Sequence, residues 1–219
     1  MLGGPGSGKG TQAEYLKKEN DFYVISVGDL LRAGKDEIVE GEGRAIGEII
    51  GEGSLLPDSV ITELVRTEIN TINTAEKSVI FDGFPRTIGQ ATALTQLAKE
   101  FTKAVGKVLH FVVDEKVLFK RILGRFKCVN CGRLYNDFFC KTKVAGVCDI
   151  CGCTSFEKRE DDNEKALKRR LDESHAKTEV LVDYYSQYGI LKTIDATGSV
   201  ESIRAAVLNS LNLRNEEVA

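Results

Sequence analysis

GGPGSGKGT, residues 3–11, is the stretch that decides the fold. Gly3, four further residues and then Gly8-Lys9 match the spacing G-x-x-x-x-G-K, in which the backbone wraps around an anion and the N-terminus of the following helix points at it. Lys9 adds a mobile positive charge. The next position, usually Ser or Thr, is Gly10, which argues against direct Mg²⁺ ligation by the hydroxyl of Thr11. Because a helical pattern follows at once, residues 3–11 predict a phosphate loop rather than a plain glycine-rich turn.

Length and composition indicate a globular protein with one sizeable core. The chain has 219 residues, of which 42% are hydrophobic, and this excludes a disordered or fibrous protein. A net charge of -3 argues against wholesale nucleic-acid binding, so an anionic ligand must meet a local basic cleft. The sequence has neither a membrane-spanning apolar run nor a signal-peptide pattern. We therefore expect a cytoplasmic protein that binds neither membranes nor nucleic acid.

Strand and helix patterns alternate along the chain. Apolar strands are expected at 22–26, 78–82, 107–114 and 190–195. Helices are expected at 11–20, 30–34, 46–50, from 57, at 91–101, 115–126, from about 161 to 187, and at 200–211. This alternation predicts an α/β fold, a doubly wound parallel sheet with helices on both faces and two insertions.

The expected strand SVIFD ends in Asp82 and is followed by GFPRT. Ligands of doubly wound sheets bind at the carboxyl ends of strands, so Asp82, Gly83 and Arg86 should face the same crevice as the phosphate loop. In the expected helix 115–126, Arg121 and Arg125 are four residues apart and should share one face. His110 lies inside an apolar strand, and we assign it no function.

Six cysteines form a metal-binding pattern. Cys128-x-x-Cys131 and Cys148-x-x-Cys151, with sixteen residues between the pairs, have the spacing of a structural Zn²⁺ site, and a glycine after each pair permits a tight turn. Four thiolates leave no open position for catalysis. Disulfides are the alternative, which a reducing compartment disfavours. Cys140 and Cys153 are left over, and Cys153 is close enough to Cys151 to be a rival ligand.

The cysteine-rich segment could also bind nucleic acid. From Arg125 to Arg159 it contains seven basic and three acidic residues, an excess of four positive charges. A zinc-ribbon nucleic-acid-dependent ATPase is therefore an alternative. A basic flap over the phosphates of a nucleotide explains the same excess, and the phosphate loop favours that interpretation.

Five stretches together resemble one family. They are GGPGSGKGTQ (3–12), GDLLR (28–32), DGFPRT (82–87), Gln90 and EDDNEKALKRRL (160–171), and their combination resembles the adenylate kinase family in its long-lid, zinc-carrying form. The resemblance implies a monomeric enzyme that transfers a phosphoryl group reversibly from MgATP to AMP, giving two ADP. It divides the chain into a P-loop core (1–26, 57–123 and 163–219), an insertion that binds the monophosphate (27–56) and a zinc-binding lid (124–162). Both insertions are expected to close over the nucleotides.

The resemblance also assigns site residues. Those expected to hold ATP are Gly6, Ser7, Gly8, Lys9, Gly10, Thr11, Arg121, Arg125, Leu134, Tyr135 and Gly198. Those expected to hold AMP are Val27, Arg32, Ser54, Leu55, Leu56, Gly83, Phe84, Pro85, Arg86, Gln90, Arg159 and Arg170. The groups expected to act on the transferred phosphoryl are Lys9, Arg86, Arg121, Arg125, Arg159 and Arg170. Asp82 is the expected anchor of Mg²⁺ through water, and the zinc ligands are Cys128, Cys131, Cys148 and Cys151.

Two departures from the usual pattern matter. Val27 replaces the family's usual Thr near the base of the monophosphate, which makes a UMP/CMP or a GTP:AMP kinase of the same family the alternative. In addition, only Met1 and Leu2 precede the phosphate loop, although about five or six residues form a typical strand. We therefore expect the natural chain to begin a few residues upstream.

Overall fold

A computed structural model of the protein describes residues 1–40, 43–52, 54, 56–72, 77–159 and 162–213. The helices are α1 (Lys9–Glu19), α2 (Val27–Ala33), α3 (Ile46–Gly51), α4 (Asp58–Thr71), α5 (Ile88–Glu100), α6 (Glu115–Leu123), α7 (Glu164–Ser186) and α8 (Val200–Leu211). The strands are β1 (Tyr23–Ser26), β2 (Val79–Asp82), β3 (Val108–Val112), β4 (Arg125–Cys128), β5 (Leu134–Asn136), β6 (Phe156–Glu157) and β7 (Leu191–Asp195).

The first two residues join two pairs of parallel strands. β1 pairs with β2, and β3 pairs with β7. Leu2 forms a parallel bridge with His110: its N–H donates to Leu109 O at 2.7 Å, and its carbonyl accepts from Phe111 N at 2.9 Å. The amino group of Met1 donates to Phe81 O of β2 at 2.9 Å. The order across the sheet is therefore β1, β2, Met1-Leu2, β3, β7. The strands that follow Leu2 in the chain lie on both sides of it. Such a reversal of strand order marks the ligand crevice of doubly wound sheets.

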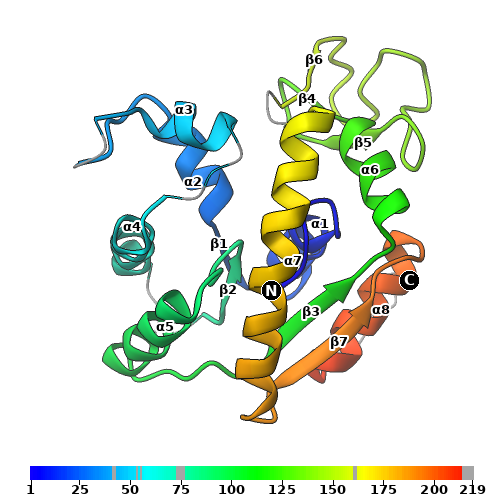
Figure 1. Ribbon diagram of the computed structural model, residues 1–219. Helices are drawn as coiled ribbons and strands as arrows, with labels where there is room; N and C mark the ends of the chain where they lie inside the picture. The colour runs from blue at the N-terminus through cyan, green and yellow to red at the C-terminus, as the bar shows by residue number, and fades with distance from the viewer. Residues whose placement is uncertain (41–42, 53, 55, 73–76, 160–161, 214–219) are drawn as a thin grey trace.

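Helices cover both faces of this parallel sheet. On one face, α1 and α8 pack through Leu16, Ile203 and Val207 against a cluster that includes Leu109 and Phe111 of β3. On the other, α5 and α7 pack against a cluster that includes Leu2 and Val108. Alternate residues of β3 thus enter opposite layers, as the pleat of a strand buried on both faces requires. The doubly wound α/β fold expected from the sequence is confirmed (Figure 1).

Two groups of elements project from the same end of the sheet. The first contains α2 and α3, whose apolar side chains form one cluster with α4. The second, which we call the lid (residues 124–162), contains the antiparallel strands in the order β5, β4, β6. Figure 1 shows these groups on either side of the upper part of α7. Among the described residues, no helix has the length and apolar character needed to cross a bilayer.

The expected helix 115–126 is too long. α6 ends at Leu123, and Arg125 is the first residue of β4, opposite Asn136. The lid explains this, because Gly124 O accepts from Asp137 N at 2.9 Å and a side chain at Gly124 would lie 2.7 Å from the ring of Phe138. The chain therefore leaves the helix to pair with β5, and the expectation that Arg121 and Arg125 share one helix face is wrong.

α2 begins three residues before the expected start at Leu30. The Ser26 hydroxyl accepts from Asp29 N at 3.4 Å, so the N-cap is the last residue of β1. Val27 consequently lies in the first turn of α2, with 3% of its surface exposed, in the same apolar cluster as Ile49. Because the side chain of Val27 is buried, only the backbone of this residue can face a ligand.

Candidate functional site

The phosphate loop leaves the sheet after Leu2 and leads into α1. Gly6 and Gly8 have φ angles of 76° and 95°, in the left-handed region that glycine adopts without strain. Gly8 is the N-cap of α1 and supplies no side-chain acceptor, and the first turn contains no acidic residue. The leading N–H groups of α1 can therefore donate to an anion, which the helix dipole also attracts.

Lys9 is held at the mouth of this loop. Its ammonium group donates to the carbonyl oxygens of Gly3 and Gly4, both at 2.8 Å, and to Ser7 Oγ at 3.1 Å. Burial lowers the pKa of Lys9 from 10.5 to about 8, against the attraction of Asp82. Repulsion from three arginines contributes to the same lowering of the pKa, and these are Arg86, Arg170 and Arg125. The structure thus brings three of the predicted arginines into the field of Lys9.

Among the charged groups that act on Lys9, Asp82 is the negative one. It ends β2, and its Oδ2 would lie 3.2 Å from a Cβ atom built on Gly10. A larger residue at position 10 would therefore crowd the carboxylate, so Gly10 allows Asp82 to approach the start of α1. Carboxylate oxygen is also a ligand type that Mg²⁺ prefers, and the residues present fit the predicted Mg²⁺ anchor.

The arginines are fixed by different partners. Arg125 makes a two-bond ion pair with Asp162, at 2.8 and 2.5 Å, and the side chain of Asp162 is 1% exposed. Arg86 Nε donates to Gly83 O at 3.0 Å. Arg121 lies within 3.5 Å of Thr197 O and 3.3 Å of Gly198 O, in the loop before α8. Asp162 was recognised in the sequence only as part of an acidic helix start.

The DGFPRT segment is anchored by a residue that the sequence analysis did not assign to the site. Asp58 accepts from Thr87 Oγ1 at 2.5 Å and from Gln90 Nε2 at 2.7 Å. Gln90 Oε1 accepts from Arg86 N at 2.8 Å, so the amide of Gln90 lies inside this network with 3% of its residue exposed. In the sequence, Asp58 showed only the signal of a helix start.

The other residues expected near AMP have either buried side chains or charged side chains that pair with each other. The side chains of Phe84 and Pro85 are buried, and their peptide bond is cis. Asp29 accepts from Arg32 at 2.5 Å and lies 3.7 Å from a terminal nitrogen of Arg159 in the lid. Of the predicted segment 54–56, Ser54 and the buried Leu56 are described, and Leu55 lies outside the described residues.

The side chain of Tyr135 points into the interior of the lid. Its ring stacks on Phe126 at 5.6 Å and meets Phe156 edge-on at 5.8 Å. Its hydroxyl lies 3.3 Å from Cys148 Sγ and accepts from Asp149 N at 2.8 Å. Tyr135 is 2% exposed, so a nucleotide can reach its backbone but not its ring. Leu134, by contrast, is 37% exposed.

Phe139 is a site candidate that the sequence analysis missed. It is 55% exposed, and the guanidinium carbon of Arg121 lies 5.8 Å from the centre of its ring. Arg121 also reaches the Gly198 carbonyl, which belongs to a residue predicted near adenine. An arginine plane beside an exposed aromatic ring suits a flat base. A single Phe in a loop carries no such signal in the sequence.

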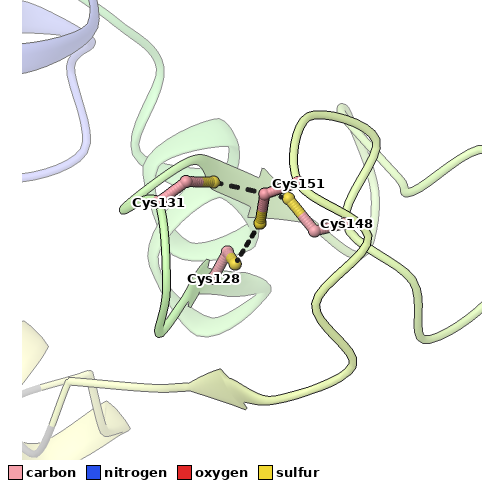
Figure 2. Close-up of side chains that lie close together, drawn as sticks. All are labelled: Cys128, Cys131, Cys148 and Cys151. Carbon is pink, nitrogen blue, oxygen red and sulfur yellow. Dashed lines mark hydrogen bonds between the residues drawn. The ribbon is translucent and has the colours of Figure 1, made fainter.

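The four predicted zinc ligands converge (Figure 2). The sulfur atoms of Cys128, Cys131, Cys148 and Cys151 all lie within 4.8 Å of one another, and two pairs are 3.5 Å apart. Tetrahedral Zn²⁺ with Zn–S bonds of about 2.3 Å requires sulfurs about 3.8 Å apart, so the donor set fits zinc. Both glycines after the cysteine pairs have φ of 71°, and the N–H of each donates to the carbonyl of the first cysteine of its pair at 2.9 Å.

The remaining cysteines stand apart from this cluster. Cys153 Sγ accepts from Ser155 N at 3.4 Å, and the backbone of Cys140 pairs with Asn136. Within the described part of the chain, the group of potential metal ligands consists of the four predicted cysteines. Cys153 is therefore not brought into the position of a rival ligand.

Comparison with known proteins identifies similar chains. A family model described as adenylate kinase matches residues 1–190. An adenylate kinase of Paracoccus denitrificans is 40% identical over 207 residues, which cover 94% of this chain and 93% of the relative. An adenylate kinase of Thermodesulfovibrio yellowstonii is 40% identical over 205 residues, covering 93% of each chain. One of Caldicellulosiruptor bescii is 37% identical over 216 residues, covering 97% of this chain and 98% of the relative.

The two glycines of the phosphate loop should differ in their tolerance of a methyl group. A Cβ on Gly6 would lie 2.8 Å from Ile122, whereas a Cβ on Gly8 would meet no atom of the described residues within 4 Å, and both have positive φ. We expect Gly6→Ala to lower the free energy of unfolding by about 1–3 kcal/mol more than Gly8→Ala. Urea unfolding followed by circular dichroism measures the difference. Equal losses would show that the close approach to Ile122 does not constrain the loop.

Tyr135→Phe should loosen the lid while keeping its aromatic packing. The change removes the hydroxyl that accepts from Asp149 N, and loss of such a hydrogen bond costs about 0.5–1.5 kcal/mol. We expect faster hydrogen exchange at the amides of residues 148–151. Tyr23→Phe is the control, because it removes a hydroxyl bonded to Glu68 outside the lid. Unchanged exchange at Asp149 in the Tyr135 variant would contradict the role of this hydroxyl.

Proposed function

The chain belongs to the adenylate kinase family, and from this premise we propose which residues carry the reversible transfer of a phosphoryl group from MgATP to AMP. The protein is a nucleoside monophosphate kinase, a phosphotransferase. The observation that carries the residue assignment is the group of charges around Lys9. Lys9 interacts electrostatically with Asp82 and with the arginines Arg86, Arg125 and Arg170, at the N-terminus of α1.

The donor side is formed by the phosphate loop and the base of the lid. Residues Gly6 to Thr11 bind the ATP phosphates through backbone N–H groups, and the ammonium of Lys9 turns from the loop carbonyls to the phosphate oxygens. Arg121 and Arg125 bind the same phosphates from the lid side. The exposed ring of Phe139, Arg121 and the backbone at Gly198 together hold the adenine, supported by their mutual contacts.

The acceptor side is formed by positive charges and fixed backbone. Arg32, Arg86, Arg159 and Arg170 bind the phosphate of AMP, and the Gly83–Arg86 backbone, held by Gln90 and Asp58, forms its platform. The phosphate of a nucleoside monophosphate is mostly ionised at neutral pH, so it attacks without a general base. The protein then supplies alignment of the two phosphates and neutralisation of charge, which are the main requirements of phosphoryl transfer.

The two insertions exclude water from this reaction. We propose that residues 27–56 and the lid, residues 124–162, close over the nucleotides onto the core, a motion carried over from the family. The contact between Arg159 and Asp29 supports this proposal, because it links the lid to the first insertion. Exclusion of water directs the phosphoryl group to AMP rather than to hydrolysis.

Two metals belong to the proposal in different ways. The family uses Mg²⁺ with ATP, and Asp82 is the residue that would hold it through water; when bound, Mg²⁺ neutralises phosphate charge. The four lid cysteines would hold Zn²⁺, which has no open position there and stabilises the fold of the lid. None of the six cysteines forms a disulfide, and thiolate ligands persist in a reducing compartment. We therefore propose a cytoplasmic protein, and a monomer, since one chain supplies both substrate sites.

The other candidate functions are not favoured. The similar proteins over nearly the whole chain are named adenylate kinase, which disfavours a UMP/CMP or GTP:AMP kinase and a nucleic-acid-dependent ATPase. The substitution at Val27 is compatible with AMP, because its side chain is buried in the apolar cluster.

Lys9→Met should abolish most activity. It removes the charge nearest the phosphate loop, and loss of one such group costs about two orders of magnitude or more in turnover. Lys17→Met is the matched control, an exposed lysine on the same helix. A coupled assay of ADP formation measures both, and circular dichroism checks folding. If a folded Lys9→Met variant turned over at the wild-type rate, the assignment of Lys9 would be wrong.

Substrate choice tests the function itself. With ATP as donor, we expect AMP to give two ADP and to exceed CMP, UMP and GMP in kcat/KM by at least about a hundredfold. ADP formation is followed for each monophosphate in turn, with and without added single-stranded DNA and RNA. Comparable rates with UMP or CMP, or hydrolysis stimulated by nucleic acid, would favour one of the other candidates.

Removal of the lid metal should lower stability rather than alter chemistry. Chelation, or Cys128→Ser with Cys148→Ser, should lower the melting temperature, because metal binding energy is folding energy in a segment this small. Cys140→Ser with Cys153→Ser is the matched control outside the cluster. Elemental analysis and thermal melts provide the measurements. Gently purified protein without stoichiometric zinc would count against a structural metal.

A further inference from the structure

Arg169 joins α7 to the loop that follows α3. Its Nη1 donates to Glu52 O at 2.9 Å, and its Nη2 donates to Ser54 Oγ at 2.6 Å. These partners lie 117 and 115 residues away in sequence. The neighbouring Arg170 has a role predicted from the sequence, whereas Arg169 has none. Figure 1 shows the end of α3 beside the upper part of α7, where this connection is made.

Of the two connected segments, α7 is firmly held on the core. α7 is anchored to the core through Leu167 and Leu171, which are 0% and 2% exposed and pack against Leu118 and Ile122 of α6. Arg169 lies on the solvent-exposed face of α7, next to Lys168 and one turn after Lys165. The Arg169 side chain thus connects a helix packed on the core with the loop after α3.

The loop it reaches belongs to the acceptor side. Ser54 starts the segment 54–56 that, under the proposed function, lines the base of AMP. Arg170, the next residue on α7, lies in the electrostatic field of Lys9. A bond from Arg169 to this loop therefore sets the distance between the wall of the AMP site and the helix that carries a phosphoryl-binding arginine.

We propose that Arg169 is a positioning residue that holds the first insertion against α7 in the arrangement that binds AMP. The planar guanidinium donates to two acceptors of one loop at once, which a lysine ammonium cannot reproduce with the same geometry. The bonds are exposed, so they can break and reform as the insertion opens and closes. The proposal rests on the proposed function and predicts an effect on AMP rather than on ATP.

Steady-state kinetics with both substrates provide the first test. In Arg169→Ala, we expect the KM for AMP to rise about fivefold to tenfold, the value corresponding to two lost hydrogen bonds, while the KM for ATP changes less than about twofold. The value of kcat should not fall. Arg169→Lys should recover part of the loss, and Lys168→Ala, which removes the adjacent exposed charge, should change neither KM.

A double-mutant cycle separates the proposed contact from a general loss of charge. Ser54→Ala removes one of the two acceptors and should raise the KM for AMP less than Arg169→Ala does. The double variant should resemble Arg169→Ala alone, because the hydroxyl of Ser54 acts through Arg169 and the backbone that lines the AMP base is unchanged by Ser54→Ala. Additive effects, or equal increases in the KM for ATP and AMP, would overturn the proposal.

A distance measurement tests the connection without relying on activity. Labels placed through unnatural amino acids at Glu48 on α3 and Glu179 on α7 leave the cysteines untouched. Without nucleotide, Arg169→Ala should shift the distance distribution to longer values than those of the wild type. An unchanged distribution in a variant with wild-type thermal stability would overturn the proposal. If the wild type failed to phosphorylate AMP, the proposed function would fail, and this measurement would still decide the role of Arg169.

Discussion

The constraint on which the site depends is the repulsion among positive charges gathered at the N-terminus of α1. Lys9 is partly buried near Arg86, Arg125 and Arg170, and its pKa is lowered mainly by burial and also by repulsion from these arginines. Three of these charges have separate anchors: loop carbonyls for Lys9, Gly83 O for Arg86 and the buried Asp162 for Arg125. Because these anchors hold the side chains before a nucleotide arrives, a polyphosphate meets an organised cluster and adds the negative charge that the cluster lacks.

The fold supplies this cluster from distant parts of the chain. Leu2 lies between β2 and β3, so the phosphate loop opens at the reversal of strand order, beside Asp82 at the end of β2. The lid brings Arg125 and Asp162 from its two ends, and its four cysteine sulfurs converge in a segment with few buried side chains of its own. The first insertion brings Asp29, which contacts both Arg32 and Arg159. Residues far apart in sequence thus depend on one another through charge.

The sequence predicted those features that follow from local spacing. The phosphate loop, the order of strands and helices and the four-cysteine cluster were all recognisable, because each is encoded within a few residues. The end of α6 was not, because pairing of β4 with β5 overrides a helical pattern that continues to Arg125. The orientation of Tyr135 and the anchoring role of Asp58 depend on partners that only the folded chain brings near, Cys148 in one case and Gln90 in the other. Resemblance assigned residues to a nucleotide, but it did not distinguish a side-chain contact from a backbone contact.

The affinity for a compound that joins two adenosines through five phosphates tests the central claim most directly. Such a compound spans both nucleotide sites and carries its phosphates past Lys9 and the converging arginines. Isothermal titration calorimetry should give a dissociation constant at least about a hundredfold below that of ATP, because the tether makes occupation of the second site intramolecular. Binding no tighter than that of ATP would contradict the account, since it would mean that the positive cluster does not lie between two adjacent nucleotide sites.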